Sequence, residues 1–287
     1  MTSRNIIIAP CGNKSFLFNQ AWLKNRDQKQ FDICLLFYHE KINDPSLYVD
    51  VDYFYHLKDF KYHMLHRLLT EIHPEWLDQY DYFYFLDDDI ELDTHAINSM
   101  FTLSRAFQTS ISQASLSSDS FCSWAMFKQQ KNSFCRFVGQ IEVMAPLFDR
   151  SSLKLCLPSF IGNRSSWGID SVWPAILKYP KDKLVVFDTI VMKHTLPVGG
   201  GELYIKIGVN PHDEWIAVAK QYNAKKHNYQ EYGRLQLVNH KYNRISFFRY
   251  KSEEFAAKIK QAWNDYDLMS RVISQRKKFL QRFRSKA

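Results

Sequence analysis

Residues 82–89 read Tyr-Phe-Tyr-Phe-Leu-Asp-Asp-Asp, an apolar run of strand length that ends abruptly in three carboxylates. Because side chains alternate along an extended chain, we expect Asp87 and Asp89 on the same side. Two such carboxylates suit Mg²⁺ or Mn²⁺, which can bridge a diphosphate and neutralise the charge that develops as it leaves. A surface turn with a helix cap is the alternative, since aspartate also favours turns. Mutual repulsion of three adjacent carboxylates favours the metal site.

The segments around this strand alternate between strand and helix patterns, which predicts an α/β fold with a mostly parallel sheet flanked by helices. In such sheets ligands bind at the carboxyl ends of the strands, where the three aspartates would lie. We expect one large domain, residues 1–250, and a helical extension, residues 251–287. The predicted strands are residues 5–9, 31–38, 53–56, 82–86, 111–116, 140–146 and 183–192, and the predicted helices are residues 16–25, 61–72, 96–107, 170–178 and about 253–284.

Composition narrows the class of protein. The chain has 287 residues, a formal net charge of +8 and five cysteines without a CxxC pair, so neither a disulfide framework nor a zinc site is expected. No apolar run approaches the roughly 20 residues of a membrane span. These features predict a cytoplasmic protein with free thiols.

A histidine follows the strand predicted at residues 183–192. His194 precedes the glycine run at residues 199–201 and could complete the coordination of the metal ion. The alternative is a hydrogen-bonded histidine at the sheet edge. The glycines could form the hinge of a lid over a bound ligand, or only a loose loop.

A further carboxylate, Asp170, follows Trp167 and Gly168 at the mouth of a predicted helix. It could be a general base that deprotonates a hydroxyl group, with Trp167 as a platform for a sugar ring. It could also simply cap the helix, in which an early Pro174 is tolerated. The two roles are compatible, because a capping residue lies at the open end of its helix.

Taken in order, these motifs resemble the GT-A glycosyltransferase superfamily, and within it the family called domain of unknown function 707. The similarity covers about residues 5–205, and each motif is short. One departure is that the family often has Asp-Glu-Asp where this chain has Asp87-Asp88-Asp89, but the outer carboxylates are kept. The matching segments are residues 73–74, 80–82, 87–89, 111–114, 142–146, 167–170 and 186–201.

The resemblance implies a GT-A-like catalytic domain that transfers a sugar from a nucleotide-diphosphate donor to a glycan or lipid-linked acceptor, in surface polysaccharide synthesis and with inversion. It implies Mn²⁺ or Mg²⁺ held by Asp87, Asp89 and His194. It implies that Asp170 is the catalytic residue. The donor would contact Pro10, Gly12, Lys61, Asp87 and Asp88, and the acceptor Gln113, Glu142, Trp167 and Asp170.

Two other classes of function compete. A metal-dependent nucleotidyl- or phosphotransferase needs the same carboxylates and cation, but the sequence lacks the phosphate loop GxxxxGK[ST]. A carbohydrate- or nucleic-acid-binding module is the non-enzymatic alternative. Nucleic acid is not expected, because the aromatic residues lie mainly in apolar strands instead of among lysines and arginines.

The C-terminal segment combines charge with apolar side chains. Residues 271–287 hold seven basic and no acidic residues, and Val272, Phe279 and Phe283 fall near one face of a helix. This pattern predicts docking on an anionic membrane, at the inner face for a cytoplasmic protein. A solvated helix packed on its own domain, or a dimer contact, is the alternative.

Overall fold

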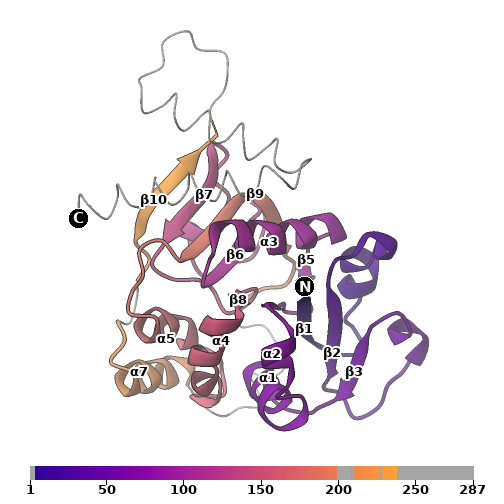
Figure 1. Cartoon of the computed structure of the whole chain (residues 1–287). Helices are drawn as coiled ribbons and strands as arrows, with labels where there is room; N and C mark the ends of the chain where they lie inside the picture. Colours follow the sequence, from indigo (N-terminus) through magenta and orange to yellow (C-terminus); the bar gives the residue numbers. More distant parts are fainter. Residues whose placement is uncertain (1–3, 199–207, 209, 226–227, 238–287) are drawn as a thin grey trace.

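The computed structural model describes residues 4–198, 208, 210–225 and 228–237 (Figure 1). The glycine run at residues 199–201 and the C-terminal helix predicted at residues 253–284 lie outside the described residues. None of the described helices is long and apolar enough to cross a membrane.

A ten-stranded mixed sheet forms the centre of the described part of the chain (Figure 1). Its strands are β1 (Asn5–Cys11), β2 (Asp32–Phe37), β3 (Tyr53–His56), β4 (Tyr82–Phe85), β5 (Ile90–Glu91), β6 (Ile111–Leu116), β7 (Ser133–Val138), β8 (Leu147–Asp149), β9 (Leu184–His194) and β10 (Glu231–Gln236). They neighbour one another in the order β10-β7-β9-β6-β8-β4-β1-β2-β3, and β5 pairs with β9.

Most strands of this sheet run in one direction. The pairs β1–β2, β1–β4, β2–β3 and β6–β9 are parallel. Only β8 and β7 oppose the common direction within the nine-strand order, because each pairs antiparallel with both of its neighbours. The predicted α/β class with a mostly parallel sheet is therefore confirmed.

Helices and short helical turns cover the sheet. The helices are α1 (Lys61–Arg67), α2 (Trp76–Gln79), α3 (Thr94–Phe107), α4 (Arg150–Cys156), α5 (Ile169–Ile176) and α7 (Pro211–Gln221). The shorter helical turns are η1 (Phe18–Trp22), η2 (Arg26–Gln28), η3 (Pro45–Tyr48), η4 (Leu68–Ile72), η5 (Ala125–Phe127) and η6 (Leu157–Ile161).

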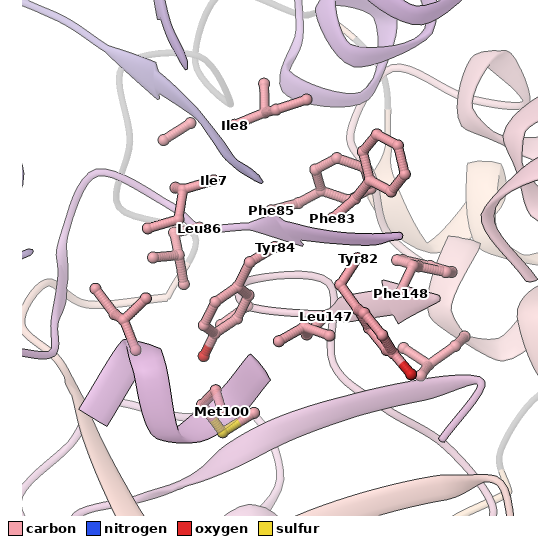
Figure 2. Packing of buried hydrophobic residues seen from close by; sticks show 14 of the residues in the cluster. Ile7, Ile8, Tyr82, Phe83, Tyr84, Phe85, Leu86, Met100, Leu147 and Phe148 are labelled. Atoms are coloured by element: carbon pink, nitrogen blue, oxygen red, sulfur yellow. The ribbon is translucent and has the colours of Figure 1, made fainter. Parts of the chain in front are cut away.

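The two faces of β4 show how the layers are arranged. Successive side chains of a strand point to opposite faces, so Tyr84 and Phe85 face opposite layers, as Figure 2 shows. The ring of Tyr84 lies 6.0 Å from that of Phe101 in α3, whereas the ring of Phe85 lies 5.8 Å from that of Phe160 in η6. Helices thus flank both faces of a sheet strand whose four residues are all buried.

The strand predicted at residues 140–146 is wrong. This segment is irregular, and the strand is β8, which begins at Leu147. Side chains from elsewhere hold the irregular backbone, because Lys61 donates to the carbonyls of Val143 and Met144 at 2.9 and 3.1 Å. The amides of Phe85 and Asp87 also donate to the carbonyls of Pro146 and Met144, so the segment is tied to the end of β4 without forming a strand there.

Other differences from the expected elements are local. The helix predicted at residues 16–25 is only the short turn η1. Strands β7 and β10 were not predicted, because charged or polar residues interrupt their patterns. In β7 the charge is Arg136, which is buried and forms an ion pair with Asp188 of β9 at 2.8 Å.

Candidate active site

The three aspartates lie directly after β4, in a turn in which the amide of Ile90 donates to the carbonyl of Asp87 at 3.2 Å. The extended geometry expected for Asp87 and Asp89 is therefore wrong, since the chain reverses here toward β5. The turn is anchored on both sides. The amide of Asp87 donates to the carbonyl of Met144 at 2.9 Å, and the amide of Thr195 donates to the carbonyl of Asp89 at 3.0 Å.

His194 reaches this acidic turn because β5 pairs with β9. Ile90 lies opposite His194 in that antiparallel pair, which brings the imidazole to the side of Asp89. His194 Nε2 lies 3.0 Å from Asp89 Oδ2, and His194 Nδ1 lies 3.0 Å from the carbonyl oxygen of Phe121. Burial lowers the pKa of His194, but the hydrogen bond and charge of Asp89 outweigh it and raise the pKa above its ordinary value.

Lys61, the first residue of α1, neutralises Asp87. Its Nζ lies 2.7 Å from Asp87 Oδ1, and the side chain of Lys61 is 11% exposed. Since the same ammonium also donates to two carbonyls of the 140–146 segment, its three N–H groups have partners within the protein. Lys61 thus ties the acidic turn to that segment, and its predicted contact with the donor stays a prediction.

Asp88 faces the loop after β1. Its Oδ2 accepts a short hydrogen bond from Ser15 Oγ and one from the Tyr38 hydroxyl at 3.2 Å. Burial raises the pKa of Asp88 to about 6, and the Ser15 hydrogen bond works in the opposite direction. Asp88 therefore holds the loop predicted to bind the donor against the acidic turn.

The loop after β1 is closely packed. The amide of Gly12 donates to Ser15 Oγ at 2.7 Å. A Cβ at Gly12 would lie 2.7 Å from side-chain atoms of Tyr38 and His39, so any larger residue would require these rings to move. Pro10 lies within β1, opposite Leu36. The predicted donor contacts of Pro10 and Gly12 stay predictions, but both residues lie at the carboxyl end of a central parallel strand.

Glu142 lies in the irregular 140–146 segment and is 4% exposed. Its amide donates to Oε1 of Gln113 in β6 at 2.8 Å, so Gln113 positions the segment in this structure. Glu142 Oε2 is buried and has no hydrogen-bond partner among the described residues. Burial raises the pKa of Glu142 to about 8, with a further increase from the charge of Asp170.

Asp170 lies in the first turn of α5, whose N-cap is Gly168. It is 7% exposed, and burial raises its pKa to about 6. Gly168 has φ of +85°, and a Cβ there would lie 1.9 Å from the ring of Trp215 in α7. Glycine thus lets the chain turn into α5 beneath that ring, which places Asp170 at the open end of its helix.

The acidic turn, Glu142 and Asp170 are electrostatic neighbours. The charges of Asp170 and Asp87 both raise the pKa of Glu142, while His194 lowers it. The fold therefore brings together carboxylates from three separate segments of the chain. The predicted residues at this place are Asp87, Asp88, Asp89, Glu142, Asp170, His194 and Lys61.

The fit to a metal ion depends on two of these carboxylates. Within residues 4–198, 208, 210–225 and 228–237, no group of three or more His, Cys, Asp and Glu side chains is arranged to hold a metal ion. Asp89 Oδ1 is nevertheless buried without a hydrogen-bond partner among them, and the charge of Asp89 acts on Asp87. Asp87 and Asp89 thus fit the mode in which Mg²⁺ takes one or two carboxylates and completes its shell with substrate phosphates and water.

Sequence reasoning did not assign roles to several residues of the site. Ser15 and Tyr38, which bind Asp88, lie at the ends of predicted elements, where no pattern marks a contact between distant segments. Trp124, Trp215 and Tyr229 surround the region of Asp170 and Trp167. The high aromatic content was the only signal for these three, and it does not separate a site from a core.

No known protein family and no curated protein matches this sequence, so the resemblance to the family of unknown function stays a prediction. Among solved structures, S. aureus TarS residues 1–349 in complex with UDP-GlcNAc is similar at 11% identity and a TM-score of 0.47, over 76% of this chain and 65% of that one. A197 from STIV is similar at 12% identity and a TM-score of 0.38, over 67% of this chain and 86% of that one. At such values residue roles cannot be transferred, and the site must be interpreted from its own geometry.

Proposed function

We propose that this chain is a metal-dependent glycosyltransferase that uses a nucleotide-diphosphate sugar. The observation that carries the proposal is the meeting of the acidic turn with Glu142 and Asp170 at the carboxyl end of β4. One group of carboxylates suits a cation bound to a diphosphate, and the other suits transfer of a proton from a hydroxyl group. An enzyme that activates a hydroxyl beside a departing diphosphate needs both.

On the donor side, Asp87 and Asp89 would hold the metal ion, which neutralises charge on the leaving diphosphate when bound. Asp88 fixes the loop of Gly12 and Ser15 next to them through its two hydrogen bonds. Lys61 and His194 hold Asp87 and Asp89 in place through ion-pair contacts of 2.7 and 3.0 Å. These residues form a preorganised acidic corner that would bind the diphosphate through its cation, with an open coordination shell instead of a closed metal cage.

On the acceptor side, Asp170 would act as general base. The acceptor oxygen forms a bond to the anomeric carbon of the sugar, the bond from that carbon to the phosphate oxygen breaks, and the proton moves to Asp170. A pKa of about 6 makes Asp170 a stronger base than an ordinary aspartate while leaving it mostly ionised at pH 7. A single displacement of this kind inverts the anomeric configuration.

The test is incubation of the full chain with UDP-, GDP- and CMP-linked sugars, with and without Mn²⁺, followed by analysis of the released nucleotide. Metal-dependent release of nucleoside diphosphate from one UDP- or GDP-sugar supports the proposal. Release of nucleoside monophosphate together with a phosphorylated sugar would indicate the competing nucleotidyl- or phosphotransferase. A thermal-shift measurement on the same mixtures reports binding independently of turnover.

We also propose that the C-terminal segment docks the enzyme on an anionic membrane, where a lipid-linked acceptor would be found. The support is its sequence, with seven basic and no acidic residues over positions 271–287. Co-sedimentation with anionic vesicles would compare the full chain with a chain that ends at Asp267. Equal binding of the two, or no binding at low salt, would contradict this proposal.

A further inference from the structure

Four aromatic side chains from four separate segments meet beside α5. They are Trp124, Trp167, Trp215 and Tyr229, and we call them the aromatic wall. The rings of Trp124 and Tyr229 lie 4.4 Å apart, and those of Trp124 and Trp215 lie 6.4 Å apart. The ring of Trp167 lies 6.5 Å from that of Trp215. The wall is therefore continuous from the loop before η5 to the loop after α7.

The wall is fixed to the helix that carries Asp170. Trp215 Nε1 donates to Ser171 Oγ at 2.9 Å, directly next to Asp170 in sequence. The ring of Trp215 lies over Gly168, where no side chain could be accommodated. Trp215 is 5% exposed, whereas the other three rings of the wall are only partly buried. Trp215 thus acts as the anchored centre, and its three partners keep part of their surface exposed.

The wall also adjoins the two acceptor-side carboxylates. Burial raises the pKa of the Tyr229 hydroxyl, and the negative charges of Asp170 and Glu142 raise it further, so both lie near that hydroxyl. Glu142 Oε2, which is buried without a hydrogen-bond partner among the described residues, belongs to the same neighbourhood. A buried acceptor atom of this kind calls for a partner, and a ligand hydroxyl would supply one.

We propose that the aromatic wall is the acceptor subsite and that its occupant is an uncharged saccharide, held with one face on the rings and its hydroxyls on Glu142 and Asp170. The proposal rests on the glycosyltransferase function proposed above and specifies its acceptor. Binding sites for small molecules combine apolar and aromatic lining with a few placed polar groups, as here. A sugar ring offers both surfaces, apolar C–H groups on its faces and hydroxyls around its rim.

Charge determines which saccharides fit. Glu142 and Asp170 are acidic, and the described residues contain no ion pair between either of them and a lysine, arginine or histidine. A carboxylated, sulfated or phosphorylated sugar at this position would face the negative charge of Asp170, which is mostly ionised at pH 7, in a buried setting. The subsite therefore selects neutral acceptors, while the diphosphate of the donor is handled at the acidic turn through its cation.

The experiment is a glycan array of neutral and acidic oligosaccharides probed with the full chain without nucleotide. We expect binding to neutral glycans only. Trp124→Ala should weaken that binding about tenfold or more, because it removes a ring on which the sugar would stack, and Trp124→Phe should restore most of it. Ile216→Ala is the matched control, because it removes an exposed side chain that is 47% accessible on the same helix as Trp215. Equal unfolding temperatures would show that each variant is folded.

The outcomes separate this inference from the proposed function. If the chain releases nucleoside diphosphate but binds no neutral glycan, or prefers acidic ones, the saccharide subsite is wrong and the transferase stands. Unchanged glycan binding in Trp124→Ala would equally overturn the subsite. If neutral glycans bind through Trp124 but no nucleotide sugar binds or reacts, the transferase is wrong and the chain is a carbohydrate-binding protein.

Discussion

Two groups of carboxylates lie close together in this molecule, and they differ in their interaction partners. In the acidic turn, each aspartate has a specific partner, with Lys61 on Asp87, Ser15 and Tyr38 on Asp88, and His194 on Asp89. On the acceptor side, neither Glu142 nor Asp170 has an ion pair among the described residues, and Glu142 Oε2 is buried there without a partner. Burial raises the pKa of Glu142 to about 8, compared with about 6 for Asp88 and Asp170.

The difference shows how one fold can separate charge binding from proton transfer. Carboxylates with ion-pair and hydrogen-bond partners are held at fixed positions, as a metal–diphosphate complex requires. Carboxylates buried without a cation bind protons near neutral pH, as general acid–base chemistry requires. Each prediction below tests whether a residue belongs to the group to which its surroundings assign it.

The largest effect on activity is expected from substitution of Asp170. Asp170→Asn keeps the shape of the side chain but removes its basicity, so turnover should fall about 10²–10⁴-fold with little change in donor affinity. In the unmodified enzyme, turnover should decline as the pH falls below about 6, because Asp170 then becomes protonated. Steady-state kinetics across pH would measure both effects. A product with retained anomeric configuration would contradict the role of Asp170 as base.

The next largest effect, on nucleotide binding, is expected from substitution of Asp89. Asp89→Ala removes the carboxylate whose Oδ1 has no hydrogen-bond partner in the described part of the chain, so Mn²⁺-dependent nucleotide binding should weaken about 10²-fold. Calorimetric titration with and without Mn²⁺ would measure the loss. Asp119→Ala is the control, since Asp119 lies outside the acidic turn, where it forms an exposed ion pair with Lys193 and accepts a hydrogen bond from Ser117. This substitution should have no effect on nucleotide binding. Unchanged metal-dependent binding in Asp89→Ala would remove Asp89 from the proposed metal site.

The sequence predicted the parts of the site that follow from local pattern. A buried strand that ends in acids placed Asp87 and Asp89 at a sheet edge, and the strand before His194 was correctly identified. The prediction from sequence failed where long-range packing determines the path of the backbone. The 140–146 segment has a strand-like composition, but Gln113 and Lys61 hold it in an irregular path that buries Glu142. No local pattern can show such contacts between residues tens of positions apart.

The same limit explains why the aromatic wall was found only in the structure. Trp167 was predicted as a sugar platform because it adjoins Asp170. Trp124 and Tyr229 are 105 positions apart in the sequence, yet their rings are in contact. The position of Trp215 between Trp124 and Trp167 likewise depends on Gly168, over which its ring lies.

A change in stability of intermediate size is expected at Glu142. Its folded-state pKa of about 8 lies above the ordinary value of 4.5, so the folded protein binds more protons than the unfolded chain between these values. Stability should therefore fall as the pH rises from about 4.5 to 8. Glu142→Gln removes the buried charge and should raise the free energy of unfolding at pH 8 by about 2 kcal/mol, but not at pH 4. Denaturant unfolding at both pH values would test this, and an equal change at both would contradict it.

The smallest effect, on stability, is expected from substitution of Ser15. It tests whether hydrogen bonds distinguish the carboxylates of the acidic turn from those of the acceptor side. The Ser15 hydroxyl stabilises the ionised form of Asp88, so Ser15→Ala should raise the pKa of Asp88 above about 6 and make Asp88 resemble Glu142. The hydrogen bond to ionised Asp88 contributes stability above that pKa and loses it as the pH falls, whereas the bond from the Gly12 amide is lost in the variant at every pH. The stability difference from the unmodified protein should thus be about 1 kcal/mol larger at pH 8 than at pH 5. A difference that does not change with pH would show that Asp88 stays ionised for another reason, and that the Tyr38 hydroxyl suffices to keep it in the first group.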